Sequence, residues 1–336
     1  MADYLSTFVV GLEEQVAELL PRRLAGARAL RMLNGMVQYR YDGPARLIDK
    51  LPFLHNTYSV LIAFPRQAQD FEAMVAAAGS KRCHYLPGKE TFRVRFVREN
   101  TFLSVPPKVL HAAERLVTKA TGMRPSRGQA ETELWYIIRS ESMGYYAQLL
   151  TRKPDKTAPG ALRGDLAYLI ATLAQTDRDS VVLDPFCGSG ALIRALRDHL
   201  PYGRLYASDS DAQAVGRLKR EPLLTESQGE VRVADALTLA HLADASVDAV
   251  VTDPPWGDFK ALPDEAAFYQ RMLMSLRRVL KPDGRAVLLT ARKRELAQAA
   301  AGGGFLVADT VHTLVNGKKT AAFVLLPRQE NETESR

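Results

Sequence analysis

Hydrophobic residues in the second half of the chain form short runs, separated by stretches in which apolar positions recur at helical spacing. Four successive runs end at an aspartate, namely Asp184, Asp209, Asp235 and Asp253. Short apolar runs that alternate with helical patterns predict a parallel sheet covered by helices. Because the carboxyl ends of parallel strands meet at one edge of such a sheet, the four aspartates are expected to line a polar ligand site.

The first of these runs continues into a glycine-rich turn. VVLD is followed by PFCGSG and then by a helical pattern, which predicts a strand, a tight turn and a helix. Gly188 and Gly190 allow the backbone to approach a ligand closely, and the helix N-terminus offers free N–H groups to an anion. A dinucleotide fingerprint has a third glycine at the position of Ile193, so the pattern argues against NAD.

The end of the chain predicts a further helix, a further strand and a hairpin. Residues 265–280 have helical spacing, residues 281–284 have the composition of a turn, and residues 285–290 that of a strand. Two more β-type runs flank Asn316-Gly317, a dipeptide typical of a tight antiparallel hairpin. The predicted fold class is therefore α/β, with a Rossmann-like sheet that ends in an antiparallel hairpin.

The first half of the chain contains shorter, mixed elements. Its opening segment alternates β-type and helical patterns, which is typical of a small α+β domain. Further on, Phe92, Val94 and Phe96 alternate with Arg93 and Arg95. This alternation predicts a half-buried antiparallel strand with one face in the core and one basic face.

The net charge of +7 is unevenly distributed. Residues 1–165 contain 24 Lys and Arg against 16 Asp and Glu, a net +8, whereas residues 166–336 contain 21 against 22, a net −1. This division suggests that one half binds a polyanion and the other modifies it. A solvated basic surface is the alternative. The candidate RNA-binding residues lie on the basic strand face or at predicted turns and are Lys81, Arg82, Arg93, Arg95, Arg98, Arg124 and Arg127.

Cysteine, histidine and hydropathy patterns exclude several classes of protein. The two cysteines, Cys83 and Cys187, cannot form a disulfide framework or a four-cysteine zinc site. The six histidines show no metal-ligand spacing, so no metal is expected. No apolar run reaches the roughly 18 residues of a membrane helix, and the N-terminus carries acids where a signal peptide has basic residues. We expect a cytoplasmic protein without a membrane partner.

The glycine-rich turn and the run ending at Asp253 together resemble class I S-adenosylmethionine-dependent methyltransferases. DPFCGSG resembles their methionine-binding loop, and DPPW resembles the (D/N)PP(Y/F/W) tetrad of enzymes that methylate exocyclic amines of bases. The resemblance implies S-adenosyl-L-methionine as the cofactor, with Asp209 holding its ribose and Asp235 its adenine amine. The candidate cofactor-binding residues are Asp184, Phe186, Cys187, Gly188, Ser189, Gly190, Asp209, Ser210, Asp235 and Ala236.

The tetrad supplies the candidate catalytic residues Asp253, Pro254, Pro255 and Trp256. An exocyclic amine conjugated to a base is a poor nucleophile, so acceptors must hold its hydrogens and direct its nitrogen toward the methyl group. The Asp253 carboxylate and the Pro254 carbonyl provide such acceptors, and the prolines fix the turn without competing N–H groups. Trp256 is expected to stack on a flipped base. Cys187 is interpreted as a small loop residue without a covalent role.

The first half of the chain resembles an RNA-binding arrangement. FRVRFVREN, TGM, ELWYIIRS and GYYAQLLTR resemble the THUMP domain, and GLEEQVAELL resembles the ferredoxin-like domain that accompanies it. The resemblance implies a ferredoxin-like domain at 1–60, a THUMP domain at 61–152 and a methyltransferase domain at 165–328. Pro, Gly and charged residues predict a linker at 153–164, and polar composition predicts a disordered tail at 329–336.

A THUMP domain followed by this catalytic domain is the arrangement of the tRNA guanosine N2-methyltransferase family. The resemblance therefore implies methylation of guanosine N2 in tRNA, with RNA as the partner. Guanine N2 of ribosomal RNA, and adenine N6 of RNA or DNA, remain as alternative targets. A further alternative is an RNA-binding protein with a degenerate methyltransferase domain, against which the intact DPFCGSG and DPPW motifs argue.

Overall fold

The computed structural model describes residues 2–65, 70–86, 90–139, 143–154, 161–221, 224–225, 227–257 and 264–329. The chain forms two compact units, which are Met1–Phe8 with Glu13–Pro154 (unit 1) and Val9–Leu12 with Asp155–Arg336 (unit 2). Residues 155–160 of the predicted linker and residues 330–336 of the predicted tail lie outside the described part. No helix in the described ranges is long and apolar enough to cross a membrane.

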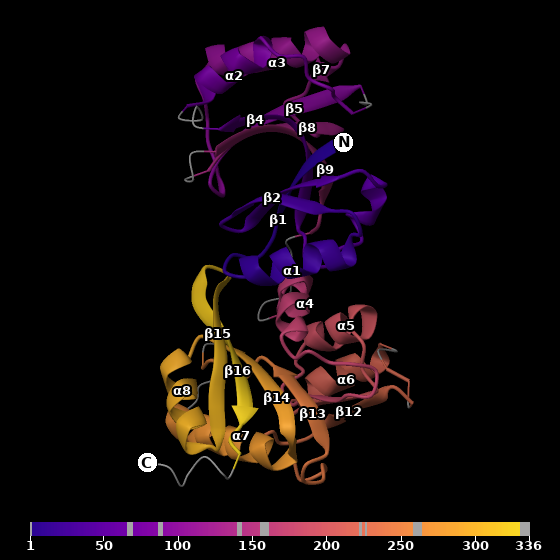
Figure 1. Cartoon of the computed structure of the whole chain (residues 1–336), viewed down its shortest axis with the longest axis vertical. Helices are drawn as coiled ribbons and strands as arrows, with labels where there is room; N and C mark the ends of the chain where they lie inside the picture. The colour runs from indigo at the N-terminus through magenta and orange to yellow at the C-terminus, as the bar shows by residue number, and fades with distance from the viewer. Residues whose placement is uncertain are drawn as a thin grey trace. The chain divides into compact units, whose positions relative to one another are not determined.

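Unit 1 is built around one sheet of nine strands (Figure 1). The spatial order is β2-β3-β1-β4-β9-β8-β5-β6, and β7 pairs with β5 outside this path. The strands are β1 (Ala2–Thr7), β2 (Arg28–Leu33), β3 (Met36–Tyr41), β4 (Asn56–Pro65), β5 (Thr91–Arg98), β6 (Thr101–Phe102), β7 (Arg124–Pro125), β8 (Thr132–Arg139) and β9 (Met143–Arg152). The helices are α1 (Glu13–Arg23), α2 (Phe71–Gly79) and α3 (Pro107–Thr121), with a 3-10 turn at Ala45–Leu47.

Helices α2 and α3 cover one face of this sheet (Figure 1). Phe92, Val94 and Phe96 of β5 are buried in a core with these helices, while Arg93 and Arg95 are only half-buried, so the predicted alternation is confirmed. The predicted antiparallel pairing is wrong for most of β5, which runs parallel to β8 and β7 and antiparallel only to β6. Strand direction follows from the connection, and α3 forms the crossover that brings the chain back parallel.

Strand β4 connects the two parts of unit 1. It pairs with β1 on one side and with β9 on the other. The domain boundary predicted between residues 60 and 61 therefore falls inside a strand, and strands from both sides of that boundary belong to one sheet. The ferredoxin-like and THUMP assignments of the two parts stay predictions.

Unit 2 contains a seven-stranded sheet in the order β12-β11-β10-β13-β14-β16-β15. Pairing is parallel from β12 to β14 and antiparallel among β14, β16 and β15, which confirms the predicted fold class. The strands are β10 (Val181–Asp184), β11 (Arg204–Asp209), β12 (Gly229–Val233), β13 (Val247–Thr252), β14 (Leu280–Thr290), β15 (Phe305–Val315) and β16 (Lys318–Pro327). The helices are α4 (Gly164–Thr172), α5 (Ala191–His199), α6 (Ala212–Arg220), α7 (Glu265–Val279) and α8 (Lys293–Gly302).

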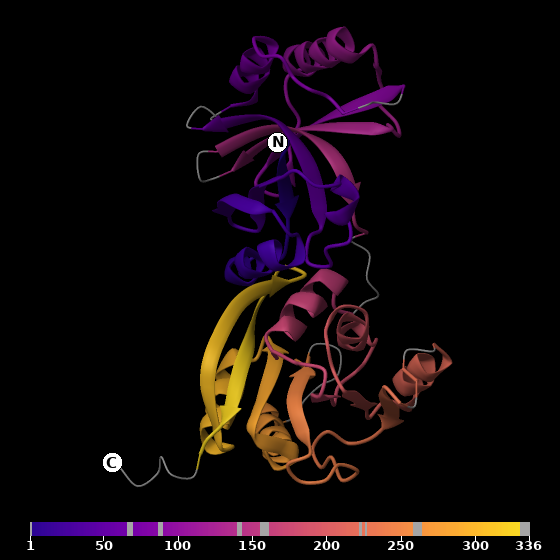
Figure 2. The same ribbon diagram turned by 45° about the vertical axis from the view of Figure 1, so that its right-hand side comes forward.

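Two predicted turns of unit 2 have different outcomes. Asn316 and Gly317 form the tip of the long β15–β16 hairpin (Figure 2), with φ of 51° and 80° that these residue types tolerate, so this turn is confirmed. The turn predicted at residues 281–284 is wrong, because these residues lie inside β14. The β13–β14 pairing passes from Leu280 to Arg285, so the intervening residues form an irregularity in the ladder.

The helices and strand order of unit 2 define where a ligand can bind. Helices α7 and α8 lie side by side (Figures 1 and 2) and share a core with β13, β14 and β16. Strand β10 lies between β11 and β13, so the order reverses at this strand. In an open parallel sheet such a reversal opens a crevice at the carboxyl ends of the strands.

Candidate active site

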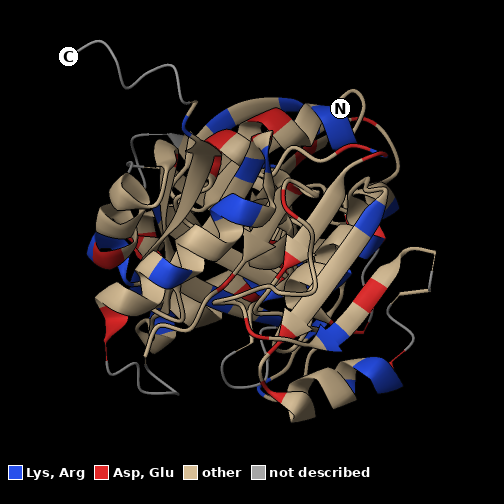
Figure 3. Ribbon diagram, turned by 90° about the horizontal axis from the view of Figure 1, so that it is seen from below, with Lys and Arg blue, Asp and Glu red and all other residues tan. Residues whose placement is uncertain are grey.

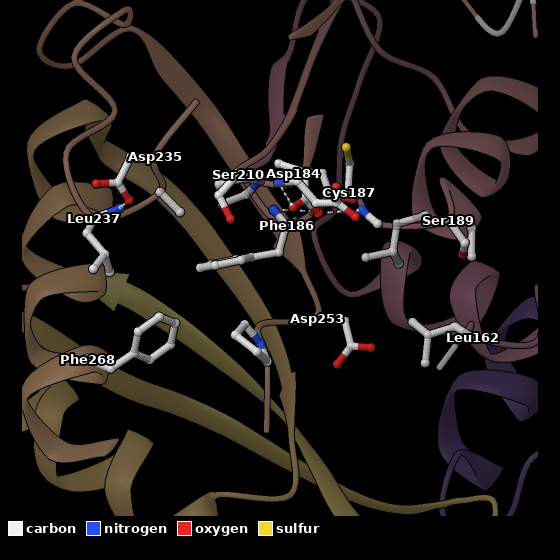
Figure 4. A pocket seen from close by; sticks show the side chains of 18 residues that line it. Leu162, Asp184, Phe186, Cys187, Ser189, Ser210, Asp235, Leu237, Asp253 and Phe268 are labelled. Atoms are coloured by element: carbon white, nitrogen blue, oxygen red, sulfur yellow. Dashed lines mark hydrogen bonds between the residues drawn. The ribbon is translucent and has the colours of Figure 1, made fainter. Parts of the chain in front are cut away.

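A cavity of about 570 Å³ lies at the carboxyl ends of the parallel strands of unit 2 (Figure 4). The predicted site residues that line it are Asp184, Phe186, Cys187, Gly188, Ser189, Asp209, Ser210, Asp235, Ala236, Asp253 and Pro255. The lining residues that sequence reasoning missed are Leu162, Pro185, Ala191, Leu192, Asp211, Leu237 and Phe268. All four strand-end aspartates therefore meet at one cavity.

The glycine-rich turn is hydrogen-bonded to the end of β11. Gly188 and Gly190 have φ of 45° and 80°, which favour glycine, and the Gly188 N–H donates to Asp209 Oδ2 at 2.9 Å. The Gly190 N–H donates to the Cys187 carbonyl at 2.7 Å, and Gly190 is the N-cap of α5. Gly190 does not line the cavity, so it shapes the turn behind the lining residues. Asp209 Oδ1 also accepts the Asp211 N–H at 2.9 Å.

Asp184 is a buried carboxyl group beneath this turn. Its Oδ1 accepts the Thr252 hydroxyl at 2.8 Å and the Phe186 N–H at 3.3 Å. The pKa of Asp184 is raised to about 7, mainly because burial disfavours its charge; the nearby Asp209 charge adds to the rise and these two hydrogen bonds oppose it. Asp184 thus supports the turn while its negative charge is disfavoured.

Asp253 differs from Asp184 in its hydrogen bonding. Its carboxyl group reaches the cavity in Figure 4, and its Oδ1 is buried without a hydrogen-bond partner among the described residues. Burial, and then the Asp184 charge, raises the pKa of Asp253 well above its usual value, against the lowering effect of a hydrogen bond with the Trp256 side chain. A buried acceptor without a donor is costly. A ligand that brings an N–H donor would satisfy it.

One side of the cavity combines a carboxyl group with an apolar wall. Asp235 Oδ1 accepts the Leu237 N–H at 2.9 Å, which fixes the loop after β12. The rings of Phe186 and Phe268 lie 5.9 Å apart between centroids, and Phe268 comes from α7. A flat heterocycle with an amine fits such a wall. Helical periodicity places Phe268 on a buried face, but no local motif marks Phe268 or Leu162 as a site residue.

The tetrad that begins at Asp253 is held in place by contacts of the Trp256 side chain and of the Trp256 carbonyl. The Trp256 indole N–H donates to the Leu289 carbonyl at 3.3 Å, and the Lys318 ammonium lies 5.7 Å from the ring centroid. Arg292 Nε donates to the Trp256 carbonyl at 2.7 Å, and Arg292 Nη2 pairs with Glu265 Oε1 at 3.0 Å. Pro254 and Trp256 do not line the cavity, whereas Asp253 and Pro255 do.

Cys187 is a buried member of the cavity lining. Cys187 is buried, and burial together with the Asp184 and Asp209 charges raises the pKa of its thiol. A protonated, buried thiol is a poor nucleophile, in agreement with its interpretation as a loop residue. Within the described ranges, no group of three or more His, Cys, Asp or Glu is arranged to hold a metal ion.

The candidate RNA-binding residues lie in three places of unit 1: on β5, after α2 and after α3. Several are already paired with acids, since Arg124 contacts Glu90 at 3.4 Å and Arg127 contacts Glu114 at 2.9 Å. Lys81 lies 5.6 Å from the Phe64 ring centroid. Figure 3 shows Lys and Arg interspersed with Asp and Glu over the ribbons.

Comparison with known proteins identifies relatives of this chain. Residues 152–318 match the family model described as RMKL-like, methyltransferase domain. The chain is 30% identical over 224 residues to the tRNA (guanine(6)-N2)-methyltransferase of Thermus thermophilus, which covers 64% of this chain and 66% of the relative. It is 32% identical over 193 residues to the tRNA (guanine(6)-N(2))-methyltransferase THUMP3 of Mus musculus, which covers 51% of this chain and 37% of the relative.

These matches span less than two thirds of each curated relative. Among solved structures, the crystal structure of TrmN from Thermus thermophilus has a TM-score of 0.81 and 24% sequence identity, over 97% of this chain and 100% of that chain. This likeness shows a common fold. The family match covers residues 152–318, so this part of the chain is similar to the RMKL-like methyltransferase domain.

Proposed function

We propose that this protein transfers a methyl group from S-adenosyl-L-methionine to the exocyclic amine of a base in RNA, and that the base is a guanosine, methylated at N2, in tRNA. The observation that carries the proposal is Asp253, whose Oδ1 is buried at the cavity without a hydrogen-bond partner among the described residues. An incoming amine supplies the donor that this acceptor lacks.

The cavity residues fit the chemical groups of the cofactor. Asp209 and Ser210 would hold the ribose hydroxyls, and Asp235 would hold the adenine amine beside the Phe186–Phe268 wall. The glycine-rich turn and the start of α5 would bind the methionine carboxylate. When bound, the cofactor supplies an electrophilic methyl group on a positively charged sulfur.

Asp253 and the Pro254 carbonyl act on the amine in this proposal. They accept its two N–H groups and thereby turn the nitrogen lone pair toward the methyl group. Held in this way, the nitrogen would receive the methyl group that the bound cofactor supplies. The nitrogen then loses one proton to the Asp253 carboxylate or to water, which restores the neutral amine. Trp256 stacks on the flipped base.

Unit 1 supplies the proposed RNA-binding surface. Residues 1–165 carry a net charge of +8, which favours a polyanion. The Thermus and mouse relatives are both named tRNA (guanine(6)-N2)-methyltransferases, which supports tRNA and guanine N2 as the target. The division of unit 1 into ferredoxin-like and THUMP parts, and a cytoplasmic location where tRNA is found, belong to the same proposal.

The test is methylation of RNA by the purified chain. Bulk tRNA and ribosomal RNA from a strain that lacks the gene are incubated with methyl-labelled S-adenosyl-L-methionine, and the digested nucleosides are analysed by mass spectrometry. We expect N2-methylguanosine in the tRNA fraction. Label in ribosomal RNA or in N6-methyladenosine would instead support the alternative targets. Failure of the chain to bind S-adenosyl-L-methionine in calorimetric titration would overturn the proposal as a whole.

A further inference from the structure

An aromatic and arginine cluster lies on the face of the unit 1 sheet opposite α2 and α3. It is named here the Phe102 cluster and consists of Arg95, Phe102, Glu133, Trp135 and Arg152. The residues come from β5, β6, β8 and β9, so the cluster joins four neighbouring strands. The cavity of unit 2 contains none of its members.

The rings and guanidinium groups of the cluster pack on one another. The Phe102 and Trp135 rings lie 5.2 Å apart between centroids. Arg95 lies 5.2 Å from the Phe102 centroid, and Arg152 lies 5.3 Å from the Trp135 centroid. Such spacings are those of aromatic and cation–π contacts. Both aromatic rings are therefore held in fixed orientations.

Glu133 fixes the polar side of the cluster. Its Oε2 accepts the Trp135 indole N–H at 3.0 Å and Arg152 Nη2 at 2.9 Å, and its Oε1 lies 3.8 Å from Arg95 Nη2. Arg93, on the same face of β5, and Arg95 each have a buried Nε without a hydrogen-bond partner in the described part of the chain. Arg95 and Arg152 thus pair with one glutamate, and Arg93 lies opposite that glutamate on the neighbouring strand, which leaves an excess of positive charge.

Phe102 is the exposed member of the cluster. It lies on the two-residue strand β6 at the sheet edge and is 56% exposed, whereas Trp135 is 6% exposed. Leu103 beside it is 39% exposed, which makes a small apolar surface next to arginines. Stable protein interfaces bury larger apolar areas. An unpaired base needs only one aromatic face and nearby cations.

We propose that the Phe102 cluster and the neighbouring Arg93 bind an unpaired nucleotide of RNA, with the base stacked on Phe102 and its phosphates bound by Arg93 and Arg152. The inference rests on the proposed function, because it takes RNA as the partner. Guanidinium groups that stack on rings also bind phosphates through paired N–H donors. The buried Trp135 and the half-buried Glu133 form the support that keeps Phe102 and Arg152 in place.

The first test compares Phe102 variants of the full-length chain. Binding of a fluorescein-labelled oligoadenylate and of bulk tRNA is measured by fluorescence anisotropy at one fixed salt concentration. We expect Phe102→Ala and Phe102→Leu to weaken binding by about fivefold to a hundredfold, the range for loss of one stacked base, and Phe102→Tyr to bind like wild type. Met274→Ala in unit 2, where Met274 is 59% exposed, is the matched control and should change nothing.

The second test uses Trp135 as a reporter. The chain has two tryptophans, so Trp256→Phe leaves Trp135 as the sole source of indole fluorescence. We expect the oligoadenylate to quench Trp135 fluorescence in this protein, and the quenching to disappear when Phe102→Ala is added. Circular dichroism and thermal unfolding of each variant report whether the sheet edge is intact.

The outcomes separate this inference from the proposed function. If wild type binds and methylates tRNA but folded Phe102→Ala and Phe102→Leu bind as tightly as wild type, the cluster has only a structural role and the inference is wrong. A change in sedimentation of these variants without a change in RNA affinity overturns it in favour of a protein contact. If wild type binds no RNA, the proposed function fails as well.

Discussion

Two carboxyl groups in the cavity, those of Asp184 and Asp253, differ in their hydrogen bonds and therefore in their expected roles. Asp184 accepts the Thr252 hydroxyl and the Phe186 N–H, so its oxygen is used within the chain. Asp253 Oδ1 has no such partner among the described residues and is buried. A ligand N–H therefore gains the most binding free energy at Asp253, because it provides the donor that this buried acceptor lacks.

Substitution of Asp253 tests its proposed role directly. We expect Asp253→Ala to lower single-turnover methyl transfer by about a hundredfold to a thousandfold, the loss seen when one group that stabilises a transition state is removed. Asp253→Asn keeps one acceptor oxygen and should lose less activity. Calorimetric titration of both variants should give nearly unchanged cofactor affinity. A fall in cofactor affinity that parallels the fall in activity would place Asp253 in cofactor binding instead.

The raised pKa of Asp184 predicts a pH dependence of stability. An acid with a higher pKa in the folded chain binds more protons when folded, so its stabilising effect is present at low pH and is lost as pH rises. For Asp184, the free energy of unfolding should fall between about pH 4, near its ordinary pKa, and about pH 7, its value in the fold.

The measurement is urea unfolding of the ligand-free chain at several pH values in this window. Asp184→Asn cannot titrate, so its unfolding free energy should depend less on pH than that of wild type. The difference between the two curves isolates Asp184 from every other titrating group. Parallel curves would show that the carboxyl group of Asp184 keeps its ordinary pKa.

At the scale of elements, the end of β14 and the start of α7 hold the tetrad loop. Arg292, just after β14, contacts both the Trp256 carbonyl and Glu265 on α7. We expect Arg292→Met to lower the methyl-transfer rate about tenfold or more while cofactor affinity stays within a few fold, because the loop that carries Asp253 loses its support. Arg292→Lys keeps the charge and should restore part of the rate.

Arg271→Met provides the control for this experiment. Arg271 lies on α7 but is exposed, so its loss should leave rate and affinity unchanged. Equal losses of rate in Arg271→Met and Arg292→Met would point to a general weakening of α7. A loss of cofactor affinity in Arg292→Met would show that Arg292 supports the cofactor side of the cavity.

The elements differ in how well the sequence predicts them, and the difference follows the range of the interactions involved. The turn at Asn316-Gly317 and the turn that contains Gly188 require left-handed backbone, so local residue types suffice. The direction of β5 depends on its partner β8, which α3 separates from it in sequence. Residues 281–284 have turn composition, yet pairing with β13 on both sides keeps them within β14.

Part of the candidate site can likewise be predicted from the sequence, and the rest depends on packing. The four strand-end aspartates are found from the sequence because each follows an apolar run at the same sheet edge. Leu162 and Phe268 reach the cavity from outside those runs, and only the packing of α7 and of the segment before α4 brings them there. The tetrad motif predicts that Trp256 faces the base, but the indole's own contacts, with Leu289 and Lys318, depend on β14 and β16.

At the scale of the whole molecule, charge and chemistry are carried by different parts of the chain. Residues 1–165 have a net charge of +8, and the rest of the chain has −1. The cavity with its four strand-end aspartates belongs to unit 2. Because the basic excess lies in the first half of the chain and the cavity in unit 2, RNA affinity should depend on unit 1 and methyl transfer on unit 2.

This division predicts that affinity and turnover change independently. Lys81 and Arg82 are exposed cations of unit 1, so Lys81→Ala with Arg82→Ala should raise the KM for tRNA and leave kcat at saturating tRNA unchanged. The slope of log affinity against log salt should become less steep by about 1 for each phosphate that the variant no longer neutralises. Asp253→Ala should do the opposite, with a lower kcat and the wild-type salt slope, because its carboxyl group contacts no phosphate.

Filter binding over a salt series and steady-state methylation of the same three proteins make the comparison. If the unit 1 variant lowered kcat at saturating tRNA, its cations would have to act on the reacting geometry itself, and the separation of binding from catalysis would be wrong.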